Sequence, residues 1–249
     1  HCLIWADGEV VPLTPPHDVL GQVIGQYLPA DKKLREMQKR SYEILSAHPV
    51  NAERKKKGLN PANSLWFWGA GTKPALSPFY DKYKKRGVMI SAVDLLKGIA
   101  VGAGIENKIV PGANGGLDTN YEGKAQAAVD ALLKEGYDFA YIHLEAPDEM
   151  GHQGSVERKV QAIENMDGRI LSLIREQMDA SGEDYRLLVL PDHPTPIRLR
   201  THVAAPVPYL LYDSSEPQGH SWHYNEKEAA ASGKVIARGC DLMGYLFSR

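Results

Sequence analysis

Residues 138–154 read DFAYIHLEAPDEMGHQG and join an apolar run to a polar loop. The apolar run predicts a buried strand over residues 138–146. The loop holds Asp148 and His152, whose four-residue spacing places both side chains on one face of a helical turn or at one loop mouth. Loops that follow strands are where α/β proteins bind ligands. Taken alone, the pair fits a metal site and, equally well, a helix cap beside a surface histidine.

Two further polar groups follow the same arrangement. The apolar run YRLLVLPDH (185–193) ends in Asp192 and His193, and His202 precedes the apolar run PVPYLLY (206–212). Either group alone also fits an ordinary polar turn. Three groups of carboxylate and imidazole side chains at strand ends, however, predict a divalent metal site of the kind that α/β enzymes use for phosphate chemistry.

Strand-like and helical patterns alternate from about residue 65 onward. Strands are predicted over residues 65–69, 88–92, 108–112, 138–146, 185–193 and 206–212. Helices are predicted over residues 91–104, 121–134, 156–178 and 233–247. This order predicts an α/β fold whose mostly parallel sheet is covered by helices on both faces.

The first 60 residues have a different pattern. The predicted elements are a strand over residues 2–5 within a hairpin, helices over 17–28 and 30–47, and a polar connection over 48–64. Apolar residues recur at helical spacing in both predicted helices. We therefore expect this part to form a smaller α+β lobe beside the main domain.

The composition of the chain argues against nucleic-acid and membrane partners. The chain has 249 residues with a formal net charge of −2, so it lacks the basic surplus of nucleic-acid-binding proteins. No apolar run approaches the roughly 20 residues that a membrane-spanning helix needs. The two cysteines, Cys2 and Cys240, lie at opposite ends and form no disulfide framework. This usage is typical of a reducing compartment and predicts a cytoplasmic protein without nucleic-acid or membrane partners.

Three stretches carry a family resemblance: HLEAPDEMGHQG (143–154), VLPDHPTP (189–196) and THVAAPVPYLLY (201–212). Together they resemble the archaeal type of cofactor-independent phosphoglycerate mutases, which belong to the alkaline phosphatase superfamily. The stretches LTPPHDVLGQ, HPVNAERKKKGLNPANSLWFWGAG, ISAVDLLKGIA and VPGANGGLDTNYEGKA look like the same family. The resemblance therefore covers nearly the whole chain.

The resemblance implies an alkaline-phosphatase-like core with an insertion lobe. Residues 1–60 would be the later half of the substrate-capping lobe, and residues 61–249 the C-terminal part of the metal-binding core. One ion would be held by Asp148, His152 and His202. A second would be held by the pair formed by Asp192 and His193, together with an aspartate and a nucleophilic serine of an N-terminal stretch.

The start of the chain and the number of its ligands suggest that part of the same fold precedes residue 1. It opens directly in a strand-like run, and five ligands are too few to complete two ion sites. We therefore expect a C-terminal fragment whose serine nucleophile lies before residue 1, and which is inactive by itself.

The implied reaction is a glycolytic one, the interconversion of 2-phosphoglycerate and 3-phosphoglycerate through a phosphoserine. The expected cofactors are two divalent ions, Mn²⁺ or Zn²⁺, with Mg²⁺ as a further candidate. The partner is a small phosphorylated substrate, and the oligomeric state is not predicted. Arg54 and His17 are candidate substrate-binding residues of the lobe, although a solvated arginine and a helix cap fit them as well.

Other functions remain open from the residues alone. Metal ligands serve the phosphate and not the rest of the substrate, so a phosphohydrolase or a homoserine-type phosphotransferase of the same superfamily has the same ligands. A non-catalytic metal-binding domain is the alternative from another class. His143, which precedes the first ligand group, is expected to lie in the core or behind the ligands.

Overall fold

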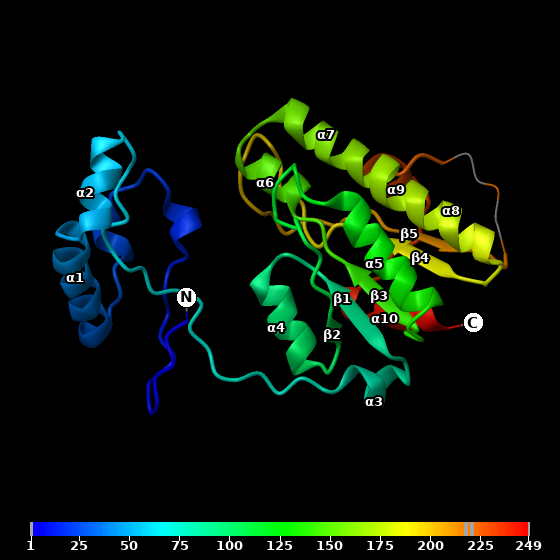
Figure 1. Ribbon diagram of the computed structural model, residues 1–249, viewed down its shortest axis with the longest axis horizontal. Helices are drawn as coiled ribbons and strands as arrows, with labels where there is room; N and C mark the ends of the chain where they lie inside the picture. The colour runs from blue at the N-terminus through cyan, green and yellow to red at the C-terminus, as the bar shows by residue number, and fades with distance from the viewer. Residues whose placement is uncertain (1, 217–218, 220–221, 249) are drawn as a thin grey trace. The chain divides into compact units, whose positions relative to one another are not determined.

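The computed structural model describes residues 2–216, 219 and 222–248, without the side chain of His17. The chain forms two compact units, His1–Pro74 and Ala75–Arg249, whose elements are labelled in Figure 1. Residues 59–78 contain no helix or strand. The predicted boundary at residue 60 thus falls at the start of this extended stretch.

The first unit is built on two helices, α1 (Lys32–Ser46) and α2 (Pro49–Lys56). Helix α1 confirms the helix predicted over residues 30–47, and its N-cap Asp31 accepts a hydrogen bond from the Leu34 N–H at 2.8 Å. Helix α2 shows that the stretch over 48–64 is not merely a connection. Pro49 begins it, at a position where a missing N–H costs no hydrogen bond.

Three predictions for the first unit are wrong. The predicted helix over residues 17–28 is two short 3₁₀ helices, η1 (Pro16–Val19) and η2 (Ile24–Tyr27), because Gly21 between them has a left-handed φ of 74°. Residues 2–5 form no strand, and the side chain of Ile4 is exposed.

The predicted strand over residues 65–69 is also absent, since side chains rather than a neighbouring strand satisfy this part of the backbone. The Leu65 N–H donates to Ser41 Oγ at 2.9 Å, and the Ala62 N–H donates to Asn51 Oδ1 at 2.8 Å. These contacts attach the extended stretch to α1 and α2.

The second unit contains a parallel sheet and a separate antiparallel pair. In the sheet, β1 (Gly87–Ile90) lies between β2 (Glu106–Asn107) and β3 (Phe139–Ile142), and both pairings are parallel. Strands β4 (Arg186–Val189) and β5 (Leu210–Asp213) pair antiparallel. Four predicted strands are confirmed in shorter form. The strand predicted over 108–112 is wrong, because the pairing with β1 ends at Asn107 just before the Val110–Gly112 turn.

Helices surround the strands of the second unit. Those before the site are α3 (Phe79–Tyr83), α4 (Asp94–Gly102) and α5 (Tyr121–Leu133). Those that follow are α6 (Ala146–His152), α7 (Val156–Met166), the π-helical turn η3 (Asp167–Leu171), α8 (Ser172–Ser181), α9 (Glu226–Ala231), η4 (Gly239–Asp241) and α10 (Leu242–Phe247). The helix predicted over 156–178 is confirmed as α7, η3 and α8 in succession. The helix predicted over 233–247 is confirmed only from residue 239.

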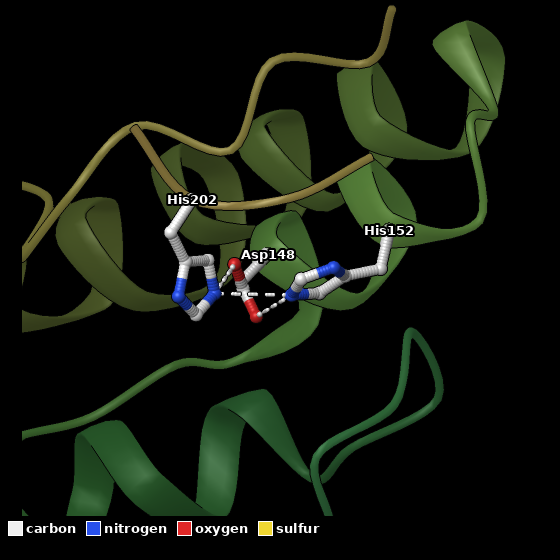
Figure 2. A group of neighbouring side chains, drawn as sticks. All are labelled: Asp148, His152 and His202. Atoms are coloured by element: carbon white, nitrogen blue, oxygen red, sulfur yellow. Dashed lines mark hydrogen bonds and ion pairs between the residues drawn. The ribbon is translucent and has the colours of Figure 1, made fainter. Parts of the chain in front are cut away.

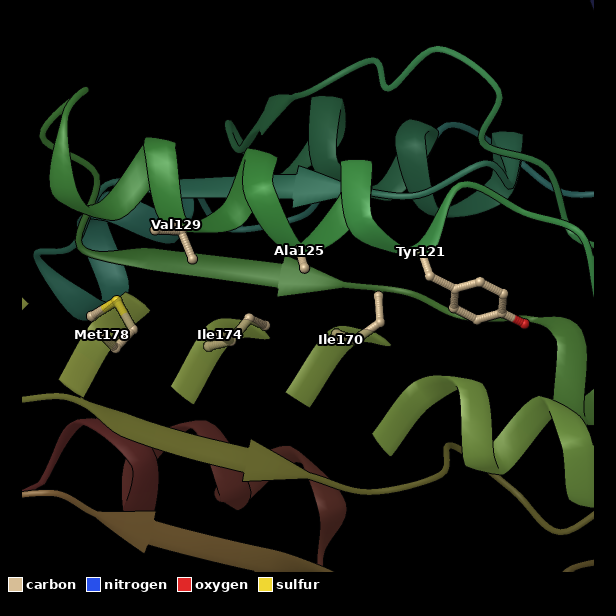
Figure 3. Close-up of a cluster of buried hydrophobic side chains, with 6 residues drawn as sticks. All are labelled: Tyr121, Ala125, Val129, Ile170, Ile174 and Met178. Atoms are coloured by element: carbon tan, nitrogen blue, oxygen red, sulfur yellow. The ribbon is translucent and has the colours of Figure 1, made fainter. Parts of the chain in front are cut away.

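The main core lies between α5 and the helix formed by η3 and α8 (Figure 3). Each helix contributes a stripe with four-residue spacing, so that side chains one turn apart face the same way. The stripes are Tyr121, Ala125 and Val129 on α5, and Ile170, Ile174 and Met178 opposite them. Burying each isoleucine contributes roughly 1.5–3 kcal/mol. This packing fixes α5 and α8 against each other near β3.

A smaller cluster holds the helix that carries the first ligand group. Ala146 and Met150 of α6 pack on Ala162 of α7, and all three are buried. Another side of α6, which carries Asp148 and Gly151, faces Thr195 in the loop that joins β4 to β5. Within the described residues, every helix is too short or too polar to cross a membrane.

Candidate metal centre

Helix α6 places Asp148 and His152 together. The helix follows β3 after a short link, Pro147 lies in its first turn, and Asp148 is there as well. A carboxylate is favoured at this end, because the free N–H groups of a helix carry partial positive charge. Four residues later His152 lies on the same face, and its Nε2 is 3.2 Å from Asp148 Oδ2. Of the two arrangements that the sequence left open, a helical turn and a loop mouth, the structure has the helical turn.

The loop between β4 and β5 supplies the third side chain. His202 Nε2 lies 3.3 Å from Asp148 Oδ1 and 3.0 Å from His152 Nε2. Figure 2 shows both imidazole rings turned toward the carboxylate from opposite sides. One ligand atom of each residue lies within 4.8 Å of the others. Two residues of one helical turn and a histidine 50 positions after His152 therefore converge on one point.

The orientation of His152 follows from its second ring nitrogen. Nδ1 lies 2.9 Å from the Arg200 carbonyl oxygen, which can only accept a hydrogen bond, so Nδ1 carries the proton. In the neutral ring the lone pair is then on Nε2, which faces the carboxylate. A backbone carbonyl that fixes the tautomer in this way is typical of histidines that bind metals. Arg200 has a left-handed φ of 56°, a conformation that is uncommon for residues other than glycine.

These three side chains fit a divalent cation. Donor atoms bound at about 2.0–2.2 Å to one tetrahedral ion lie about 3.4 Å apart, close to the separations observed here. His152 Nε2 and His202 Nε2 lie 3.0 Å apart, a separation that is favourable only with a proton or a cation between the two nitrogens. One carboxylate and two imidazoles form a donor set suited to Zn²⁺ or Mn²⁺.

The second pair of predicted ligands lies beside this group. The ring of His193 lies against that of His202, with centroids 3.8 Å apart and the ring planes tilted by 35°. His193 Nε2 is 3.3 Å from Asp192 Oδ2, and the Asp192 side chain is largely exposed. The structure thus places all five predicted ligands next to one another, but only Asp148, His152 and His202 form a single cluster.

Sequence reasoning missed one residue that contacts this cluster and a second residue that holds the first. Thr195 is buried, and its hydroxyl donates a hydrogen bond to Asp148 Oδ1. Lys159 of α7 donates to the Thr195 carbonyl oxygen at 2.7 Å. The threonine stands between two prolines in PDHPTP, and this sequence context does not indicate that its side chain is buried. Nothing in the sequence distinguishes Lys159 from other helical lysines.

Buried polar groups lie behind the ligands at the end of β3. His143 Nδ1 is 3.4 Å from Ser91 Oγ, and burial lowers the pKa of this histidine while the nearby Asp192 acts in the opposite direction. Burial also lowers the pKa of Lys124, whose ammonium group donates to the His143 carbonyl oxygen at 3.1 Å. His143 is therefore partly buried at the end of β3, close enough to Asp192 and Asp148 for both to affect its pKa.

A neighbouring hollow of about 660 Å³ is bordered by the other side of α6. Its lining includes Asp118, Glu145 and Glu149, with one cation, Arg158. Burial raises the pKa of Glu145, and the carboxylates of Glu149 and Asp148 raise it further. Because these carboxylates repel anions, the hollow is a poor place for a phosphorylated substrate.

The candidate substrate-binding residues belong to the first unit. Arg54 lies in the last turn of α2, and its Nε donates to the Asn60 carbonyl oxygen at 2.7 Å. This contact attaches the guanidinium to the end of its own helix. The side chain of His17 lies outside the described part of the structure.

Comparison with known proteins identifies a family for the chain that carries this cluster. The family described as "Metalloenzyme superfamily" matches residues 31–239. A 2,3-bisphosphoglycerate-independent phosphoglycerate mutase of Methanosarcina barkeri is 45% identical over 252 aligned residues. The alignment covers 99% of this chain and 63% of that protein. The chain thus spans less than two thirds of the length of this relative.

Solved structures have the same fold. The PH0037 protein from Pyrococcus horikoshii superimposes with a TM-score of 0.67 at 30% identity, over 80% of this chain and 52% of that one. A cofactor-independent phosphoglycerate mutase from Thermoplasma acidophilum superimposes with a TM-score of 0.51 at 23% identity, over 88% of this chain and 53% of that one. The second likeness concerns the fold alone, and together they support the alkaline-phosphatase-like α/β fold.

Proposed function

This chain belongs to the metalloenzyme superfamily, and we propose that it supplies the metal-binding core of an enzyme that interconverts 2-phosphoglycerate and 3-phosphoglycerate. One observation carries the proposal. Asp148, His152 and His202 converge on one point in a chain that is 45% identical to a phosphoglycerate mutase. Membership of the superfamily implies that a divalent metal ion is used.

Within this proposal, the three convergent residues hold one ion and the neighbouring pair contributes to a second. Asp192 and His193 lie beside the first group, where the His193 ring contacts that of His202. Two ions a few ångströms apart are a common arrangement in enzymes that transfer phosphoryl groups. The mixture of carboxylate and imidazole favours Mn²⁺ or Zn²⁺, with Mg²⁺ as a further candidate for the more oxygen-rich second site.

The bound ions would supply positive charge to the phosphoryl oxygens and lower the pKa of an attacking hydroxyl. The residues of this chain hold the donors in place for that purpose. Asp148 presents one oxygen to each imidazole, and the Arg200 carbonyl keeps His152 in the tautomer whose Nε2 faces inward. The Asp148 carboxylate and the His152 imidazole are thereby oriented before substrate binds.

The reaction would move the phosphoryl group from one hydroxyl of the glycerate to a serine, and from that serine to the other hydroxyl. Each step breaks one P–O bond and forms another, so no oxidant or second substrate is needed. We assign no residue of this chain to the serine role. The activity therefore belongs to the whole protein, which we expect to be a cytoplasmic enzyme of glycolysis.

We further assign residues 1–60 to a substrate-capping lobe and residues 61–249 to the catalytic core. Arg54 is the residue of the lobe best suited to a phosphate or carboxylate, because guanidinium binds such groups with two parallel hydrogen bonds. His17 is a second candidate in the same lobe. An Arg54→Ala variant of the whole protein should raise KM without loss of bound metal, and unchanged kinetics would remove this residue from the substrate site.

The proposal as a whole is tested by a coupled mutase assay on the whole protein. The protein is assayed after chelation and again after Mn²⁺ is restored, without added bisphosphoglycerate. We expect activity to disappear with the chelator and to return with Mn²⁺. A protein that binds Mn²⁺ but never converts 3-phosphoglycerate would overturn the substrate assignment while leaving the metal site intact.

A further inference from the structure

Thr195 is unusual among the residues of the loop between β4 and β5. Only 4% of its surface is exposed, although Asp192 in the same loop is open to solvent. A buried hydroxyl is costly unless it is hydrogen-bonded, so its partners define its role. Those partners are residues of the metal centre.

The Thr195 hydroxyl lies between the two groups of ligands. A carboxylate can only accept, so the hydroxyl donates its single proton to Asp148 Oδ1. The oxygen then has lone pairs for another donor, and His193 Nδ1 lies 3.4 Å away, at the long end of hydrogen-bond range. A proton on Nδ1 of His193 leaves the lone pair on Nε2, which is the nitrogen available to an ion.

The backbone of Thr195 is fixed as firmly as its side chain. Lys159 donates to its carbonyl oxygen at 2.7 Å. Gly151 of α6 also comes so close that a Cβ there would lie 2.7 Å from that oxygen and 3.0 Å from Thr195 Cγ2. Helices α6 and α7 therefore hold the threonine in one place, and the hydroxyl cannot move away without disturbing both.

We propose that Thr195 is a positioning residue that couples the two ligand groups: its hydroxyl orients the Asp148 carboxylate and the His193 imidazole for metal binding. The proposal concerns the same site as the proposed function, and it rests on that function only for the use made of the bound ion. Asp148 shares one oxygen between Thr195 and His202, so loss of the hydroxyl frees this carboxylate to rotate.

The test compares side chains that differ by a single group. Thr195→Val keeps the shape and removes the hydroxyl, whereas Thr195→Ser keeps the hydroxyl and removes the methyl group. The Mn²⁺ affinity of the whole protein is measured by electron paramagnetic resonance of the free ion, without substrate. Thr119→Val is the matched control, because Thr119 is also buried and its hydroxyl accepts from the Asn114 N–H at 3.0 Å.

We expect Thr195→Val to weaken Mn²⁺ binding about 10–100-fold, as is typical when a partner of a metal ligand is lost. Thr195→Ser and Thr119→Val should bind like the wild type. A packing role would give the reverse order, since serine lacks the methyl group that contacts α6. If the valine variant does not fold, Thr195→Ala against Thr195→Ser isolates the same oxygen atom.

Unchanged affinity in Thr195→Val, or an equal loss in Thr195→Ser, would overturn the positioning role. Neither result depends on the reaction, because no substrate is present. A wild-type protein that binds Mn²⁺ without mutase activity would, by contrast, contradict the proposed function alone.

Discussion

Asp148 is the residue on which the candidate metal centre depends most. Each of its carboxylate oxygens faces one imidazole, at 3.2 Å and 3.3 Å. It also accepts the hydrogen bond of Thr195. Removing its charge therefore affects every other member of the group.

Asp148→Asn is expected to lower Mn²⁺ affinity by more than about 100-fold, a larger loss than substitutions behind a ligand cause. The amide keeps the shape, so the fold should be retained, as circular dichroism can check. Glu149→Gln is the matched control, because Glu149 is the next carboxylate on α6 and borders the neighbouring hollow instead. Equal affinities in the two variants would argue against the assignment of Asp148.

Lys124 gives a prediction that depends on pH. Burial lowers its pKa below the ordinary value of 10.5, so the unfolded chain binds this proton more tightly than the folded one. The destabilising effect of the charge is therefore complete at low pH and is relieved as pH rises toward 10.5. In urea unfolding, the stability of the wild type minus that of Lys124→Met should increase between pH 7 and 9.5. A difference that stays flat or falls with pH would contradict this sign.

At the scale of elements, the contact between α6 and the loop after β4 determines the geometry of the centre. Gly151→Ala would place a methyl group 2.7 Å from the Thr195 carbonyl oxygen, a backbone atom that cannot yield easily. We expect a loss of about 1–3 kcal/mol in the free energy of unfolding, as for other overpacked sites. The same variant should weaken Mn²⁺ binding, because Thr195 is displaced from Asp148. Wild-type stability in chemical denaturation would show that the loop adjusts freely.

Elements with a strong local signal were predictable from sequence. The helices α1, α5 and α7 to α8 have regular apolar spacing, and Asn120 caps α5 by accepting from the Gly123 N–H at 2.9 Å. The strand predictions over 2–5 and 65–69 failed, because an apolar run predicts burial and not a partner strand. The tertiary contacts of Ser41 and Asn51, which hold the second of these stretches, have no local signature.

The candidate site was predictable in its residues but not in its connections. Asp148, His152 and His202 were identified by residue type and position at strand ends, and the structure brings them together. The hydrogen bonds of Thr195, Lys159 and the Arg200 carbonyl were not, since they depend on how the loop folds back on α6. The positions of ligand residues can be predicted from the sequence, whereas the hydrogen bonds that orient these ligands depend on three-dimensional packing.

At the scale of the whole molecule, metal binding should add stability. A ligand that binds only the folded state at 100 times its dissociation constant contributes about 2.7 kcal/mol. For a protein of this size that corresponds to a rise of roughly 5–10 °C in the melting temperature. Calorimetry with and without Mn²⁺ should show this rise in the wild type and none in Asp148→Asn. An equal rise in both proteins would mean that the ion stabilises through other residues.

The position of the ion is the most direct test of the central claim, that Asp148, His152 and His202 hold a divalent metal. Crystals of the whole protein grown with Mn²⁺ would be measured at the manganese absorption edge. We expect an anomalous peak bounded by these three side chains, and no peak there in Asp148→Asn. Anomalous density elsewhere, or an undiminished peak in the variant, would contradict the account.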